Sequence, residues 1–281
     1  MKKILVVFDA LNFKPEVLDF AASIARIADS GIAGLLVYDT RMATMPGVNM
    51  LAGQAYVEEI VITVEDQKAH ELRISENLAA FRDACFARKV SADVQLRRGI
   101  PSDVIIQESR FADLMIIHPS LTFDAQVNVP TDFVKDILKG AECPVLVAAE
   151  VNRPITEVVI AYDGSRQSMH AIKQFCAQLP AMCSRKATVL HVIEDGRRDL
   201  FDEHNDSFQS WLSIHFPDCT IVSLAGNAQD VLFNYFVEQE GNTKLLVAGA
   251  YGRSAISRFF RPSATEEVLE KVDIPLFIAH L

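Results

Sequence analysis

Two glycines and a serine-containing stretch near the carboxyl end have the residue types and spacing of an anion-binding loop. Gly249 and Gly252 follow the apolar run LLVA, and positions without a side chain let a ligand approach the backbone closely. Ser263 and Glu266 then form the pattern that opens a helix, whose first N–H groups and partial positive charge favour phosphate. The same Ser–Glu pair is also a capping box that needs no ligand.

Three further residues could complete such a site. Asp163 ends an apolar run and can accept hydrogen bonds from a ribose or a base. Thr265 lies in the first turn of the expected helix, and Arg253 adjoins Gly252, where a guanidinium could neutralise phosphate charge. Together these residues predict a nucleotide-type ligand.

The elements that must position these residues occur twice in the chain. The run Ile4–Asp9 returns as Val158–Asp163, and the run Pro144–Ala149 returns as Pro275–His280. The segment DLMIIHP, which begins at Asp113, returns as KLLVAGA with the same offset of 131 residues that relates the two closing runs. This internal repeat predicts two domains, residues 1–150 and 151–281.

Each half predicts the same doubly wound α/β fold. Continuous apolar runs are typical of strands buried on both faces of a parallel sheet, and here they alternate with helical patterns. We expect a five-stranded, mainly parallel sheet with helices on both faces in each domain. Residues Val57–Lys89 are expected to be mostly helical, as are Asp199–Phe216. Ligands of such sheets bind at the carboxyl ends of the strands, where the strand order reverses.

Composition narrows the class of protein. The net charge is −10, and neither half is basic, which argues against binding to a nucleic-acid backbone. No apolar stretch approaches the length of a membrane span, and the apolar run at the start is too short for a signal peptide. Five scattered cysteines without a CxxC pair favour reduced thiols and a cytoplasmic location.

The second half resembles the universal stress protein family. Gly249-x-x-Gly252, nine residues and then Pro262–Ser263 are similar to that family's G-x-x-G-(nine)-G-[S/T] loop. The strand that ends in Asp163–Gly164–Ser165 and the closing strand PLFIA are similar to the family as well. The resemblance covers nearly the whole chain as a tandem of two such domains.

This resemblance implies an ATP-binding domain with a stress-response or regulatory role. It places Asp163 near the adenosine and the backbone of Val192 beside the adenine. It places a set of loop residues around the phosphates, with or without Mg²⁺: Gly249, Gly252, Arg253, Ser263 and Thr265. The family has a glycine where this chain has Pro262, which lacks an N–H, so we expect weaker ATP binding or a shifted phosphate.

The first half departs from the pattern at each loop position. The offset of 131 pairs Gly249 with His118, Gly252 with Leu121 and Ser263 with Asp132. Side chains there would obstruct a close approach, and a carboxylate would repel phosphate. We therefore expect domain one to keep the fold without this nucleotide site, with His118 in a structural role.

The sequence leaves two functions open. In the first, domain two is a nucleotide-sensing regulatory module; in the second, neither domain binds nucleotide and the tandem is an interaction scaffold or a carrier of a small apolar ligand. No motif of a hydrolase, a zinc protease or a P-loop enzyme occurs, so we expect no rapid enzymatic turnover, although slow ATP hydrolysis is compatible with the site. His191 is expected to pack within a buried strand.

The closing strands PVLVAA and PLFIAH are expected to pair with each other. Such pairing would cover two sheet edges at once and make a pseudo-dimer within one chain. Association of two chains into a homodimer is also compatible with the sequence, and protein partners stay unidentified.

Overall fold

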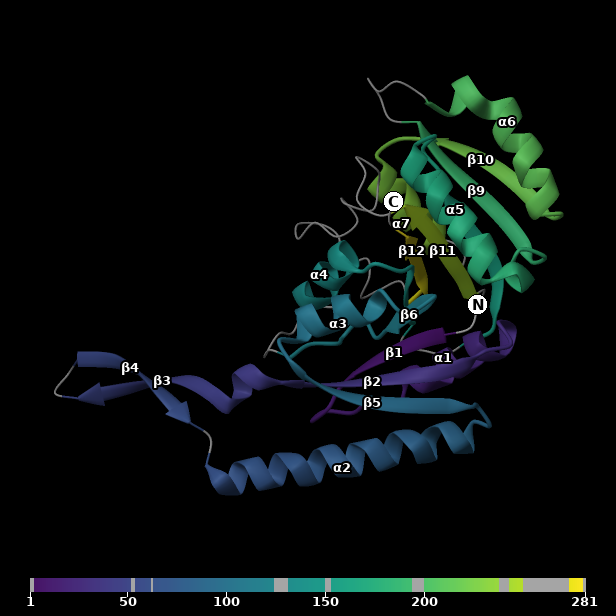
Figure 1. Ribbon diagram of the computed structural model, residues 1–281. Coiled ribbons are helices and arrows are strands. Elements are labelled where there is room, and N and C mark those ends of the chain that lie inside the picture. Colours follow the sequence, from purple (N-terminus) through teal and green to yellow (C-terminus); the bar gives the residue numbers. More distant parts are fainter. Residues whose placement is uncertain are drawn as a thin grey trace.

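The computed structural model describes residues 3–51, 54–61, 63–123, 131–149, 153–193, 200–237, 243–249 and 273–279. Its main feature is one ten-stranded sheet that runs through both halves of the chain, in the order β10-β9-β8-β11-β12-β7-β6-β1-β2-β5 (Figure 1). Within this sheet, the five strands of each half are parallel to one another. The expected fold class, two tandem doubly wound α/β domains with five strands each, is confirmed.

The described residues of the first half contribute five strands to this sheet and form four helices. The strands are β1 (Lys3–Asp9), β2 (Gly31–Asp39), β5 (Ala92–Gly99), β6 (Leu114–Ile117) and β7 (Val145–Val147). The helices are α1 (Val17–Ile27), α2 (Val64–Ala87), α3 (Pro101–Ser109) and α4 (Asp132–Gly140), and a short 3₁₀ turn, η1 (Thr40–Ala43), follows β2. The strand order reverses between β1 and β6, which is where such sheets bind ligands.

The second half repeats this arrangement. Its strands are β8 (Ile155–Ala161), β9 (Lys186–Ile193), β10 (Cys219–Ala225), β11 (Thr243–Gly249) and β12 (Leu276–Ala279). Its described helices are α5 (Arg166–Gln178), α6 (Leu200–His215) and α7 (Ala228–Val237), with a 3₁₀ turn, η2 (Pro180–Met182), after α5. The strand order here reverses between β8 and β11.

The two closing strands join the halves, as expected from the sequence. β7 pairs antiparallel with β12, and the register places Leu146 opposite Phe277. Both of these side chains are fully buried. The chain therefore contains a pseudo-dimer whose central strands come from different repeats.

Successive side chains of each strand point alternately into two cores, one on each face of the sheet. In β1, Ile4, Val6 and Phe8 point to the face covered by α1, α2, α5 and α6. Leu5 and Val7 point to the face covered by α3, α4 and α7. Each core continues from one half into the other, so apolar burial as well as strand pairing couples the repeats.

The expected helix Val57–Lys89 is wrong at its start. Residues Gln54–Val61 form strand β4, which pairs antiparallel with β3 (Thr44–Leu51) in a separate two-stranded sheet that projects beyond the first turn of α2 (Figure 1). Tyr, Val and Ile are frequent in this stretch and favour strands. The helix begins only at Val64, because Thr63 and Asp66 form a reciprocal capping box, a signal that the sequence analysis missed.

A buried ion pair lies at the beginning of the strands of domain two. Glu157 and Lys244 are opposite each other on β8 and β11, 2% and 1% exposed, with 3.9 Å between Oε2 and Nζ. Thr188 donates a hydrogen bond of 2.5 Å to the Glu157 carboxylate. Burial lowers the pKa of Lys244, while the negative charge of Glu157 opposes that shift. The repeat carries the opposite charges at the equivalent positions Lys3 and Asp113.

We expect Lys244→Met to lower the free energy of unfolding by about 3–5 kcal/mol, because it leaves the Glu157 carboxylate buried without its closest buried cation. The double variant Glu157→Gln/Lys244→Met should recover most of that loss, since neither charge then remains. Urea unfolding followed by circular dichroism measures both. Lys186→Met is the control, because its exposed ammonium should contribute less than about 1 kcal/mol. A Lys244→Met variant as stable as the parent would contradict this account.

Candidate ligand sites at the carboxyl edge of the sheet

In domain two the structure brings three of the predicted site residues to one edge. Asp163 follows β8, Val192 lies near the end of β9, and Gly249 ends β11. β8 lies between β9 and β11, so the three residues occupy adjacent strands. Ala161 pairs with Leu190, so Val192 is level with Asp163, two residues further along both strands. This is the point where the strand order reverses.

Asp163 shapes the turn that leaves β8. Its Oδ1 accepts a hydrogen bond of 3.0 Å from the Ser165 N–H, which makes an Asx turn. Gly164 within that turn has a φ of +75°, a conformation that favours glycine. Ser165 then caps α5 by accepting a bond from the Ser168 N–H. The Asp163 side chain remains exposed at this edge and accessible to a ligand.

Gly249 has a packing reason to be glycine. A Cβ atom at this position would lie 2.7 Å from the carbonyl carbon of Gln167 and 2.8 Å from the Ser168 nitrogen. Both are backbone atoms in the first turn of α5, which begins only three residues after Asp163. The close contact between β11 and α5 therefore requires glycine here whether or not a ligand binds.

The remaining residues predicted for this site are Gly252, Arg253, Ser263 and Thr265. They lie outside the residues that the structure describes, as does Pro262. Their proximity to Asp163 and Val192 stays a prediction from the sequence.

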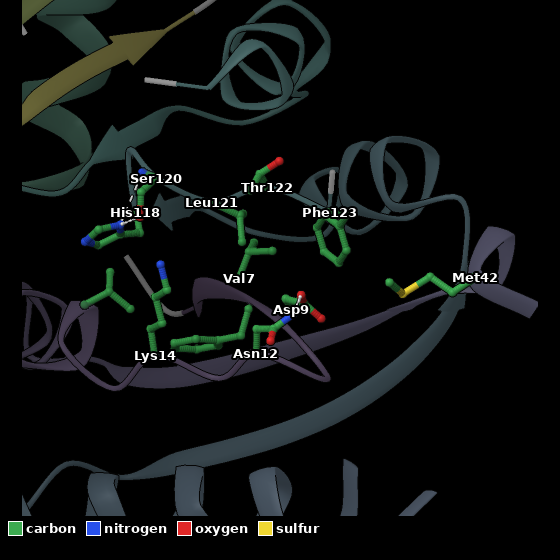
Figure 2. A pocket seen from close by; sticks show the side chains of 12 residues that line it. Val7, Asp9, Asn12, Lys14, Met42, His118, Ser120, Leu121, Thr122 and Phe123 are labelled. Atoms are coloured by element: carbon green, nitrogen blue, oxygen red, sulfur yellow. Dashed lines mark hydrogen bonds between the residues drawn. The ribbon is translucent and has the colours of Figure 1, made fainter. Parts of the chain in front are cut away.

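The equivalent edge of domain one contains a cavity of about 520 Å³ (Figure 2). Its walls come from the end of β1, the segment before α1, the turn η1 and the segment after β6. The residues that line it are Val7, Phe8, Asp9, Asn12, Lys14, Val17, Met42, His118, Ser120, Leu121, Thr122 and Phe123. The sequence predicts the loss of the nucleotide loop here, and no motif in it indicates this cavity.

A later helix start accounts for the space. Helix α1 begins eight residues after Asp9, whereas α5 begins three residues after Asp163. Lys14 and Pro15 occupy the extra segment, so no helical turn lies where α5 contacts Gly249. His118, at the position equivalent to Gly249, can therefore carry a side chain.

Asp9 repeats the role of Asp163. Its Oδ1 accepts a bond of 2.8 Å from the Leu11 N–H, and its Oδ2 accepts one of 2.6 Å from the Asn12 side chain. Asp9 is 9% exposed, so the first-half carboxylate is more deeply placed than its counterpart. Both halves thus use an aspartate after the first strand to hold the turn.

Local bonds occupy backbone N–H groups that a phosphate would need in domain one. Ser120 N–H donates to His118 Nδ1 and Leu121 N–H donates to the His118 carbonyl, at 3.2 and 3.0 Å. Thr131 caps α4 by accepting from the Val134 N–H, and its own N–H donates to the Pro119 carbonyl. Among the described residues of this edge, these three N–H groups are therefore not available to a phosphate chain.

Asp132 lies in the first turn of α4, next to the cap Thr131. Its exposed carboxylate is 3.0 Å from the ammonium of Lys135, a largely buried side chain on the same helix. A negative charge in this turn opposes phosphate binding, because like charges repel.

The histidines are held by local contacts. His118 Nδ1 lies 2.7 Å from the Ser120 hydroxyl and also accepts from the Ser120 N–H, so its proton is on Nε2. His191 is 3% exposed and stacks on Phe201 with ring centroids 4.3 Å apart, which confirms the expected packing role. Within the described segments, no group of three His, Cys, Asp or Glu residues is arranged to hold a metal ion.

The remaining sequence expectations concern thiols and membranes. All five cysteines are free thiols, and burial raises the pKa of Cys143 to about 12, because a thiolate there would lose its hydration. Among the described helices, none is both long and apolar enough to cross a membrane.

Comparison with known proteins places these features in a class. No protein-family model matches the chain. The universal stress protein Slr1230 of Synechocystis sp. is 24% identical over 290 residues, which covers 98% of this chain and 99% of that protein. Two solved structures are similar to this chain in fold. A universal stress protein from Archaeoglobus fulgidus has a TM-score of 0.68 at 15% identity, covering 99% of this chain and 98% of its own. One from Pseudomonas aeruginosa, described as putative, has a TM-score of 0.57 at 14% identity, covering 99% and 92%.

The fold is that of a tandem, doubly wound α/β protein. In sheets of this type, ligands bind at the carboxyl ends of the strands. The chain resembles universal stress proteins over its full length in both sequence and fold, as the loop and strand motifs predicted.

We expect Gly249→Ala to destabilise the protein by about 1–3 kcal/mol, because the added Cβ must displace the first turn of α5. Thermal and urea unfolding measure the effect. The matched control is His118→Ala in domain one, which removes a half-buried side chain without creating a clash and should cost about 1 kcal/mol or less. A Gly249→Ala variant as stable as the parent would show that β11 and α5 are not in tight contact.

Proposed function

We propose that this chain is a stress-response regulatory protein that binds ATP or a related adenine nucleotide at the carboxyl edge of domain two. The observation that carries the proposal is the convergence of Asp163, Val192 and Gly249 at the strand-order reversal. The loop pattern that follows Gly249 in the sequence supports it. Nucleotide occupancy would then change which partner or assembly state the protein favours, in proportion to the difference in affinity between the two states.

The described residues suit the adenosine half of such a ligand. The exposed Asp163 carboxylate can accept hydrogen bonds from ribose hydroxyls, and its Asx turn holds it at the edge. The backbone at Val192, level with Asp163, can pair with the adenine edge. Gly249 carries no side chain between these two positions and the start of α5.

The phosphate half of the proposal comes from the sequence alone. Gly252, Ser263 and Thr265 would offer N–H groups and hydroxyls, and Arg253 would neutralise charge, with Mg²⁺ as a companion of the phosphates. Pro262 removes one N–H donor from this loop, so the proposed affinity is lower than that of a loop with glycine there.

A non-enzymatic role in the cytoplasm completes the proposal, with slow ATP hydrolysis as a side reaction that regulation does not require. Two chains joining into a homodimer would make a four-domain assembly.

The test of nucleotide binding begins with denaturing freshly purified protein and identifying any released nucleotide by mass spectrometry, followed by ATP titration calorimetry. We expect Ser263→Asp to abolish binding, because it places a carboxylate beside the phosphates. We expect Pro262→Gly to strengthen binding about tenfold or more, because it restores a donor to a charged acceptor.

Asp132→Asn is the control for the Ser263 variant, since it changes an acidic residue at the equivalent place in domain one and should leave ATP affinity unchanged. If neither the parent nor Pro262→Gly binds ATP, the nucleotide proposal is wrong.

The alternative function, an interaction scaffold or carrier without nucleotide, has one observation in its favour. In domain one three described backbone donors at the equivalent edge, the N–H groups of Ser120, Leu121 and Thr131, are already bonded within the protein. If the backbone donors of domain two were bonded in the same way, the pseudo-dimer would serve as a platform for protein partners or for small apolar ligands.

A further inference from the structure

We propose that the cavity of domain one is a second, separate ligand site, which takes a small monocarboxylic acid with an apolar or aromatic body. The cavity lies between the end of β1 and the segment after β6, and its volume of about 520 Å³ is that of small-molecule sites in general. It lies in the opposite half of the molecule from the proposed nucleotide site and does not depend on it.

The cavity has a polar end and an apolar end. In Figure 2, Lys14 and His118 lie at one end, whereas Phe123 and Met42 lie at the other. Phe123 is held edge-on against Phe133, with ring centroids 5.1 Å apart. Val7 and Leu121 are buried between the two ends and make the wall apolar. A ligand that fills this space must therefore be amphipathic along its length.

Lys14 determines the charge of the polar end. It is the only basic side chain other than His118 among the twelve residues that line the cavity, and its exposed ammonium is a single positive charge. Nδ1 of His118 accepts from the Ser120 N–H, so this nitrogen is occupied within the protein. The single ammonium of Lys14 matches one carboxylate.

The bonds of three described backbone N–H groups near the cavity favour a carboxylate over a phosphate ester. The N–H groups of Ser120, Leu121 and Thr131 already donate to His118 Nδ1, the His118 carbonyl and the Pro119 carbonyl. A phosphate needs several donors for its three oxygens, whereas a carboxylate is satisfied by one ammonium and solvent. The first turn of α4 also carries Asp132, which repels a more highly charged ligand.

Asp9 limits the ligand to one acid group. Its carboxylate lies between the two ends in Figure 2 and is tied to Leu11 and Asn12. A second negative charge midway along the ligand would lie next to this partly buried carboxylate and be repelled. A hydroxyl at the same place would instead find an acceptor.

Methionine methyl NMR on the full chain tests the proposal at the cavity itself. Met42 lines the apolar end, whereas Met169 and Met182 belong to α5 and η2 of domain two and serve as internal references. In protein labelled with ¹³C-methyl methionine, with the Met42 signal assigned from Met42→Leu, the probes are phenylacetate, its uncharged amide and the dicarboxylate suberate. We expect phenylacetate to shift the Met42 signal at millimolar concentration and to bind more tightly than either other probe.

Two variants distinguish the contribution of the Lys14 charge from that of the cavity volume. Lys14→Gln should weaken phenylacetate binding by about tenfold or more and leave binding of the amide unchanged, because only the acid uses the ammonium. Thr122→Trp should fill the cavity and abolish both, while unchanged Met115, Met169 and Met182 signals report an intact fold. Lys68→Gln on α2 is the matched control and should bind like the parent.

The proposal is overturned if phenylacetate leaves the Met42 signal unchanged, if acid and amide bind equally, or if Lys14→Gln retains the preference for the acid. A larger response of Met42 to ATP than to phenylacetate would overturn it as well, since domain one would then be a nucleotide site. Each of these results is independent of ATP binding in domain two, where the Ser263 and Pro262 variants give the answer.

Discussion

The antiparallel pairing of β7 with β12 is the interaction on which the rest of the structure depends. Each repeat would otherwise expose the edge of a short closing strand whose side chains are all apolar, an arrangement prone to uncontrolled pairing. Their pairing buries both edges, makes one continuous sheet and lets the cores on both faces run from one repeat into the other. The two carboxyl edges consequently belong to one continuous sheet.

A second constraint decides what each edge can bind. The distance along the chain from the first strand to the helix that follows determines whether that helix closes against the fourth strand. In domain two the helix begins at once and its first turn requires Gly249 to lack a side chain. In domain one Lys14 and Pro15 postpone the helix, and the space that opens is lined by side chains from four segments. The repeats therefore share a framework and differ in the chemistry at the ligand edge.

Much of the fold could be predicted because its signals are local. A few neighbouring residues are enough to indicate the apolar runs of β1 and β8 and the alternation of strands with helices. The same holds for the Asx turns after Asp9 and Asp163. The β3–β4 hairpin was missed because its residues are compatible with both structures, and the capping box at Thr63 that separates strand from helix went unread. The ion pair of Glu157 and Lys244 was also not foreseen, because 87 positions separate the two residues and only the sheet register makes them neighbours.

The sequence by itself determined the doubled plan, the fold class and the carboxyl edge at which a ligand would be sought. Those conclusions follow from periodicity and repetition, which are properties of the chain. Only the tertiary structure decided that Gly249 is needed for helix packing, that the N–H groups of Ser120, Leu121 and Thr131 are already bonded and that a cavity remains in domain one. These depend on where segments far apart in the chain meet, and a difference of a few residues in a helix start is enough to change the outcome.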